Sequence, residues 1–220
     1  MKIAILLFDE ITVLDAIGPY EVLHRLPHAE VHWVAKQKGP VRAEGGLRLM
    51  ADHTLQEVTQ ADLLLVPGGF GARRAQGDPE ILAWLRAIDA TTQLTTSVCT
   101  GSILLGAAGL LRGHRATTHW AFYEQLASHG ARPVAERVVR DGKYATAAGV
   151  SAGIDLALTL AIELRGEDVA SGIQLGIEYD PAPPLQSGTP ATAPAPVRER
   201  VYARCHARDA EIAALLAAES

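Results

Sequence analysis

The chain has 220 residues, of which 48% are hydrophobic and 20% charged, and it carries a net charge of −5 at pH 7. This composition is typical of a soluble globular protein, and the length fits one large domain or one domain with an appended arm. The acidic balance argues against a nucleic-acid surface, which needs clustered lysine and arginine. The longest apolar stretch, Ile103 to Leu111, falls far short of the ~20 residues of a membrane span, and no signal segment opens the chain. We therefore expect a cytoplasmic protein.

Short apolar runs alternate with helical patterns up to Leu175. These runs are too short and too uniformly apolar for amphipathic helices, and they are typical of strands buried on both faces. Such alternation predicts crossover units, and therefore a mostly parallel sheet with helices on both faces. In chain order we expect strand Lys2–Phe8, helix Gly18–Leu26, strands Val31–Ala35 and Asp62–Val66, helix Pro79–Ile88, strand Gln93–Val98, helices Gly101–Leu110 and Trp120–Ala127, strands Glu136–Arg140 and Lys143–Ala147, and helices Ile154–Leu164 and Val169–Leu175.

The composition changes from Asp180 onward. The segment DPAPPLQSGTPATAPAPV, which begins at Asp180, is rich in proline and alanine and predicts an extended arm rather than a packed core. A charged helix is expected at Arg198–Glu219, with Val201, Ile212 and Leu215 on one side. We therefore expect an α/β domain over residues 1–180, followed by an arm and helix over 181–220 that pack on the domain or on a dimer partner.

Three unusual stretches follow predicted strands. Asp15 comes after the first strand, the glycine pair at Gly68 comes after the DLLLV strand, and Cys99 lies between the QLTTSV strand and the helix at Gly101. In open α/β sheets, ligands bind beyond the carboxyl ends of the strands. If these strands are parallel neighbours, an acid, a glycine-rich turn and a thiol share one edge of the sheet.

The position of Cys99 predicts a nucleophile elbow, a sharp turn from strand to helix that presents its central side chain outward. A helix start should lower the pKa of the thiol and favour the thiolate. Free N–H groups of Gly69, Phe70 and Thr100 can face negative charge that develops on a substrate, and Asp15 can donate or relay a proton. The alternative is that Cys99 is a small buried hydrophobic residue.

Two other patterns compete with this site. The sequence GVSAG at Gly149–Gly153 matches a serine nucleophile elbow, but the only later histidine, His206, lies in the charged C-terminal helix, so Ser151 is better explained as a helix cap. The glycine-rich turn PGGFGAR lacks the spacing of a dinucleotide or phosphate-binding loop. Neither pattern predicts a serine hydrolase or a nucleotide site.

The histidines do not predict a metal site. His24, His28 and His32 recur at every fourth residue, but Pro27 interrupts the helix and His32 falls in a strand. His119 alone is kept near the proposed site, with packing at a helix start as the alternative. Cys99 and Cys205 make no disulfide framework.

Long stretches of the chain resemble the ThiJ/PfpI superfamily, in order and over nearly the whole length: LDAIGPYEVL, LLVPGGFG, TTSVCTGSILLGAAGLLRGHRATTHWAF, ERVVRDGKYATAAGVSAGIDLALTLA and YDPAPPLQSGTP. Within it they are most similar to the isonitrile hydratases. The resemblance implies a flavodoxin-like three-layer sandwich, a homodimer, no cofactor, and hydration of an isocyanide to the N-substituted formamide. It also implies that Cys99 is the nucleophile, that Asp15 is its acid/base partner, and that Thr100 follows the nucleophile.

Two departures from the superfamily bear on function. Many peptidase-like and amidotransferase-like members have histidine after the cysteine, whereas Thr100 stands here, which points away from proteolysis. The hydratases are glycine-rich where this chain has Ala147-Ala148-Gly149. Two other functions stay open: a glyoxalase-like or deglycase-like enzyme that acts on reactive carbonyls, and a domain that senses a ligand or redox state without catalysis.

Overall fold

A seven-stranded sheet forms the centre of the computed structural model, which describes residues 1–218. The strand order is β10-β11-β7-β6-β1-β2-β5, and every neighbouring pair is parallel except β10 with β11. The strands are β1 (Lys2–Leu6), β2 (Glu30–Ala35), β5 (His53–Thr54), β6 (Leu63–Val66), β7 (Leu94–Val98), β10 (Val138–Asp141) and β11 (Tyr144–Ala147).

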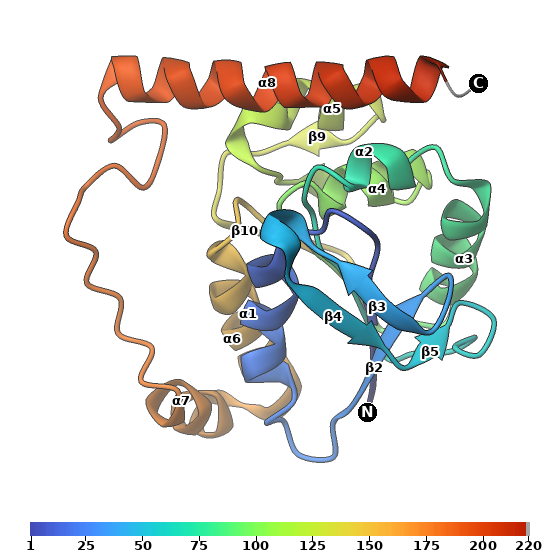
Figure 1. Ribbon diagram of the computed structural model, residues 1–220. Coiled ribbons are helices and arrows are strands. Elements are labelled where there is room, and N and C mark those ends of the chain that lie inside the picture. The colour runs from blue at the N-terminus through green and yellow to red at the C-terminus, as the bar shows by residue number, and fades with distance from the viewer. Residues whose placement is uncertain (219–220) are drawn as a thin grey trace.

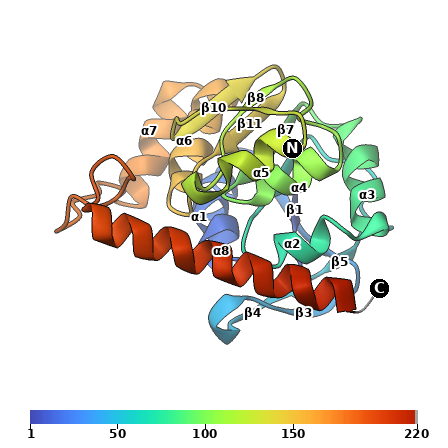
Figure 2. The ribbon, with the colours of Figure 1, turned by 90° about the horizontal axis from the view of Figure 1, so that it is seen from above.

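Helices cover both faces of this sheet. On one side, α1 packs against α6, and α6 against α7; on the other, α4 packs against α2, α3 and α5 (Figures 1 and 2). This confirms the predicted flavodoxin-like three-layer sandwich with a mostly parallel sheet. The helices are α1 (Val13–Leu23), α2 (Ala72–Ala75), α3 (Pro79–Asp89), α4 (Gly101–Ala107), α5 (Tyr123–Ser128), α6 (Ala152–Arg165) and α7 (Glu167–Gly176).

The central strands are buried because both of their faces meet helices. Every side chain of β6 and of β7 is buried, as a strand covered on both sides requires. The hydroxyl groups of β7 are compatible with this burial where they find backbone partners; Thr96 donates to the carbonyl of Leu64 at 2.8 Å. The sheet therefore holds the ends of β1, β6 and β7 in a fixed arrangement.

The first helix differs from the prediction. It begins at Val13 rather than at Gly18, so Pro19 lies inside the helix instead of opening it. The proline ring fits because Gly153 of α6 faces it, and a Cβ at Gly153 would come within 2.9 Å of that ring. As a consequence Asp15 lies in the first turn of α1 and not in a preceding loop.

Several short elements were not predicted. A hairpin of β3 (Gly39–Arg42) and β4 (Arg48–Ala51) carries the 3₁₀ turn η1 (Glu44–Gly46) at its tip. The predicted helix at residues 120–127 is divided into the 3₁₀ turn η2 (Trp120–Phe122) and α5, and β8 (Arg115–Ala116) pairs with β9 (Arg132–Pro133). These segments are too short to leave a clear hydrophobic period in the sequence.

The C-terminal part crosses the top of the molecule. Residues 181–194 are largely exposed and run outside the body, and α8 (Ala195–Ala218) lies over α2 and η2 (Figure 1). The helix begins three residues earlier than predicted, and the predicted end at Glu219 lies outside the described residues. Ile212 is fully buried, but Leu215 is 49% exposed, so the apolar face of α8 is narrower than the sequence indicated.

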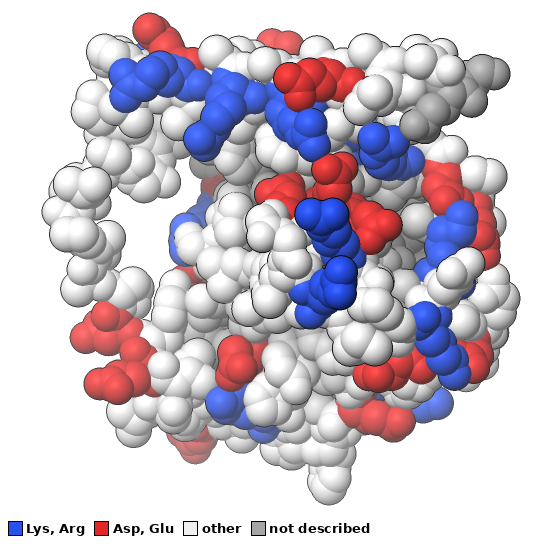
Figure 3. Space-filling view, viewed as in Figure 1, with Lys and Arg blue, Asp and Glu red and all other residues white. Residues whose placement is uncertain are grey.

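Charged groups are mixed over the surface. In the view of Figure 3, basic side chains on α8 lie above acidic side chains of the body. Within residues 1–218, no helix is long and apolar enough to cross a membrane. Over the same residues, no three histidine, cysteine, aspartate or glutamate side chains converge as metal ligands would.

The start of α4 allows a test of packing at the edge of the sheet. A Cβ at Gly101 would collide with the carbonyl oxygen of Val66, whereas a Cβ at Gly172 in α7 would have nothing within 4 Å. We expect Gly101→Ala to lower the free energy of unfolding by about 2 kcal/mol and Tm by about 5 °C. Gly172→Ala should leave Tm unchanged or raise it slightly. Thermal unfolding of both variants measures the difference, and equal Tm values would contradict this packing.

Candidate active site

Asp15, Gly68 and Cys99 meet at one edge of the sheet, as the sequence predicted. The strands β1, β6 and β7 are parallel neighbours, and these three residues follow their carboxyl ends. The N–H of Gly68 donates to Oδ2 of Asp15 at 2.9 Å. The Cys99 thiol forms a hydrogen bond with the Asp15 carboxyl. The acid and the thiol, far apart in sequence, therefore form a pair.

Cys99 occupies the turn between β7 and α4 in a left-handed conformation. Its φ is +57°, which is uncommon for a residue other than glycine. Its N–H donates to the carbonyls of Ala147 and Ala148 at 3.1 and 3.0 Å. Its carbonyl accepts from the hydroxyls of Thr118 at 3.0 Å and Ser102 at 3.2 Å. Four hydrogen bonds to this one residue maintain a conformation that would otherwise relax.

The Asp15 carboxyl is fully buried, and its burial determines its proton affinity. Burial raises the pKa of Asp15 to about 7, against hydrogen bonds from Gly68 and Cys99 that lower it, while the charge of Glu44 raises it further. Oδ1 is buried and accepts no hydrogen bond from a nitrogen or oxygen donor within the described residues. A carboxyl in this setting can bind or release a proton near neutral pH, which an ordinary aspartate does not.

The expected lowering of the Cys99 pKa is wrong. Burial raises the pKa of the thiol well above its usual value, and the negative charge of Asp15 raises it further. Hydrogen bonds from the N–H groups of Thr100 and Val150 lower it, as a helix start should, but burial outweighs them. Cys99 is therefore held as a neutral thiol, and Asp15 is the titratable side chain next to it.

The sequence predicted free N–H groups at Gly69 and Phe70, and this prediction is wrong because both groups donate hydrogen bonds. Gly69 donates to Oγ1 of Thr100 at 3.0 Å, and that hydroxyl donates to the Gly69 carbonyl at 3.1 Å. Phe70 donates to Oε1 of Glu44 at 2.8 Å. The N–H groups that reach the sulfur belong to Thr100 and to Val150. Thr100 was predicted. Val150 was not, because the GVSAG pattern points to the serine that follows it.

A cavity of about 200 Å³ opens in front of Cys99. Gly69, Thr100 and the side chains of Phe70, His119 and Phe122 line it together with Cys99. Two further lining residues carried no sequence signal. Glu44 comes from η1 at the hairpin tip, and Cys205 comes from α8. The cavity is small and mostly apolar, which suits a compact substrate.

His119 faces this cavity and also caps the following turn. Its Nδ1 accepts from the N–H of Ala121 at 3.3 Å, and burial lowers its pKa. A Cβ at Gly149 would approach Cδ2 of His119 to 3.0 Å, so this glycine leaves room for the ring. Both interpretations left open by the sequence therefore hold together: His119 packs at a helix start and, as a neutral ring, lines the cavity.

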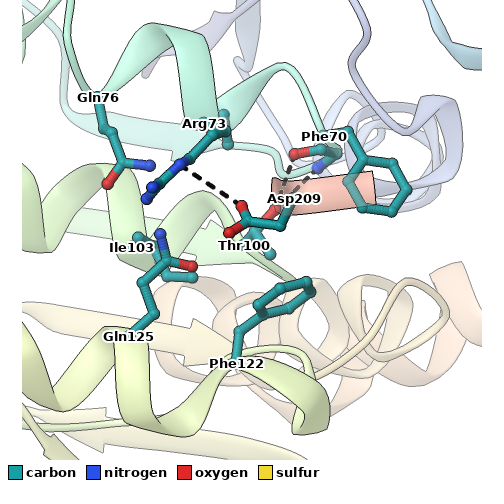
Figure 4. A pocket seen from close by; sticks show the side chains of 10 residues that line it. Phe70, Arg73, Gln76, Thr100, Ile103, Phe122, Gln125 and Asp209 are labelled. Carbon is teal, nitrogen blue, oxygen red and sulfur yellow. Dashed lines mark hydrogen bonds and ion pairs between the residues drawn. The ribbon is translucent and has the colours of Figure 1, made fainter. Parts of the chain in front are cut away.

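A small recess of about 20 Å³ lies beside Thr100 (Figure 4). Arg73 of α2 and Asp209 of α8 form an ion pair of 3.6 Å across it, and Gln76 and Gln125 point into the same space. The ion pair ties the C-terminal helix to the body next to the cavity.

The competing patterns do not form sites. Ser151 lies at the start of α6 and accepts from Arg137 at 3.3 Å, while His206 contacts the carbonyl of Ala121 at 2.9 Å, so no serine–histidine pair exists. His32 contacts His53 at 3.2 Å and neither His24 nor His28.

Comparisons with known proteins agree with this geometry. The DJ-1/PfpI family model matches residues 1–163. The chain is 48% identical over 204 residues to isonitrile hydratase from Pseudomonas putida, covering 93% of this chain and 90% of that one. It is 35% identical over 171 residues to the HTH-type transcriptional regulator CdhR of Pseudomonas aeruginosa, covering 74% and 49%. The crystal structure of a ThiJ/PfpI family protein from Pseudomonas syringae superposes with a TM-score of 0.92 at 40% identity, covering 95% and 89%.

The raised pKa of Asp15 makes stability depend on pH. Its folded-state value of about 7 lies above the ordinary 3.8, so the folded protein keeps a proton that the unfolded chain releases. Stability should therefore fall as pH rises between these values. Asp15→Asn stays neutral and still accepts from Gly68, so it should gain on the order of 2 kcal/mol relative to wild type between pH 5 and pH 7. Urea unfolding of both proteins at each pH tests this, and a constant difference would contradict the buried acid.

Proposed function

Because the chain belongs to the DJ-1/PfpI family, we propose that it is an isonitrile hydratase, an enzyme that adds water to an isocyanide to give the N-substituted formamide. The observation that carries the proposal is the buried pair of Cys99 and Asp15 at the base of a small apolar cavity. Identity of 48% over 93% of the chain to a hydratase supports the choice of reaction within the family.

In the first half of the reaction, Cys99 is the nucleophile. Asp15 accepts the thiol proton as the sulfur forms a bond to the terminal carbon of R–N≡C. Asp15 then donates that proton to the same carbon, which gives the thioimidate R–N=CH–S–Cys99. One shared proton serves both groups, because a thiolate and a carboxylate in contact disfavour each other's charge.

In the second half, water attacks the thioimidate carbon. Asp15 accepts one proton from the water as the C–O bond forms and passes it to the nitrogen, which gives R–NH–CH(OH)–S–Cys99. The C–S bond of this tetrahedral intermediate then breaks, the hydroxyl proton returns through Asp15 to the sulfur of Cys99, and R–NH–CHO leaves. The reaction transfers no electrons, so the proposal invokes no redox cofactor.

The remaining residues have positioning and binding roles in this proposal. Thr100 holds the Gly69 turn through two hydrogen bonds, and its N–H, together with that of Val150, stabilises negative charge on the sulfur. Phe70 and His119 contact the substituent on nitrogen. We further propose a cytoplasmic homodimer, on the resemblance to the superfamily alone.

Turnover of cyclohexyl isocyanide, followed by the appearance of the formamide, tests the activity. Cys99→Ala and Asp15→Asn should each lower kcat/KM at least 100-fold without loss of folding, because one removes the bond-forming atom and the other the proton carrier. Methylglyoxal serves as the second substrate. Turnover of methylglyoxal alone would favour a carbonyl enzyme, and full hydratase activity of Cys99→Ala would overturn the nucleophile.

The proposed base predicts an acid limb in the pH profile. Below a pH of about 7, Asp15 is protonated and cannot accept the thiol proton, so kcat/KM should fall tenfold per pH unit. Glu44→Gln removes a negative charge that raises the pKa of Asp15 but keeps an acceptor for the N–H of Phe70. The limb should then shift to lower pH. An unshifted limb would show that another group titrates.

A further inference from the structure

Three residues separate the cavity at Cys99 from a second, outer hollow. The outer hollow has a volume of about 500 Å³. Glu44, Phe70 and Cys205 line both spaces, so these side chains form the partition between them. The inner cavity is mostly apolar, whereas charged side chains line the outer hollow: Glu10, Arg204 and Arg208 beside Glu44. Both spaces expose mostly apolar surface, and the outer one differs in the charged side chains of its wall.

Two sides of the partition are fixed by the body of the protein. Glu44 accepts from the N–H of Phe70 at 2.8 Å and from the hydroxyl of Thr12 at 3.3 Å, which locks the hairpin tip to the turn after β6. A change of Glu44 would alter the electrostatics of Asp15, so this residue is not suited to vary the size of the cavity alone.

The third side, Cys205, comes from a different part of the chain. It lies on α8, beyond the residues 1–163 that the family model matches. The Cys205 thiol makes no hydrogen bond to the described residues that would restrict a substitution, and it is partly buried. Its side chain is also the smallest of the three, so its replacement changes the width of the partition directly.

The helix that carries Cys205 is held in a defined position. His206 contacts the carbonyl of Ala121 at 2.9 Å, and its ring lies tilted against that of Tyr202 at a centroid separation of 4.1 Å. Arg208 donates to Glu10 at 2.8 Å, and Ile212 is fully buried. These contacts lie on both sides of Cys205 in the sequence and fix its distance from the cavity.

We propose that Cys205 determines which isocyanides the enzyme accepts: its side chain closes the inner cavity and restricts the substituent on nitrogen to a compact, uncharged, apolar group. This proposal rests on the proposed function. A linear chain too long for about 200 Å³ would have to pass the partition that Cys205 helps to form and enter the outer hollow.

The test compares kcat/KM for three substrates: methyl, cyclohexyl and n-decyl isocyanide. Cys205→Ala widens the partition and should raise the n-decyl to cyclohexyl ratio about tenfold or more. Cys205→Leu narrows the cavity and should lower the cyclohexyl to methyl ratio by a similar factor. Cys205→Ser is close in size and should keep both ratios, which separates side-chain volume from thiol chemistry. Ala203→Leu, on the exposed side of α8, is the matched control and should keep activity and both ratios.

The outcomes separate the two proposals. The inference fails if wild type hydrates isocyanides but Cys205→Ala and Cys205→Leu leave both ratios unchanged. It also fails if these variants lower kcat/KM equally for all three substrates, because Cys205 then does not select by size. If Cys205→Ser changes the ratios as strongly as Cys205→Leu, the thiol rather than its volume is responsible, and the inference also fails. If wild type hydrates none of the three substrates, the proposed function itself fails.

Discussion

The burial of a carboxyl group against a thiol is the constraint on which this structure depends. Asp15 and Cys99 are both removed from water, and this burial raises the pKa of each; the charge of Asp15 raises the pKa of Cys99 further. The strand order brings the two together, and the hydrogen bonds around the elbow prevent them from separating. The raised pKa of both groups is a consequence of this burial.

The same contact explains the glycines of the turn after β6. A Cβ at Gly68 would come within 2.5 Å of the Thr100 nitrogen and 2.9 Å of the Asp15 carboxylate, and one at Gly69 would collide with the backbone near Thr12. The turn is rich in glycine because three segments of backbone converge on the acid. An anion-binding loop, which such a pattern also suggests, would leave its N–H groups free, and here they are occupied.

Long-range order was easier to predict than local chemistry. Buried apolar runs with helices between them predict a parallel sheet, and a parallel sheet places Asp15 beside Cys99. Glu44 and Cys205 could not be predicted, because a hairpin tip and an appended helix carry no motif and reach the cavity only in three dimensions. The predicted lowering of the Cys99 pKa was wrong because a helix start is visible in the sequence, whereas the depth of burial that outweighs it is not.

The exposed arm affects how α8 stays docked on the body of the protein. Residues 181–194 add little buried surface, yet they tether the helix to the body. A short tether provides a high effective concentration, so modest contacts are enough to keep α8 docked. The arm thereby separates the stability of the fold from the composition of the cavity wall, and α8 can change its sequence without a matching change in the core. The same α/β domain can thus carry different side chains of α8 at the wall of the cavity.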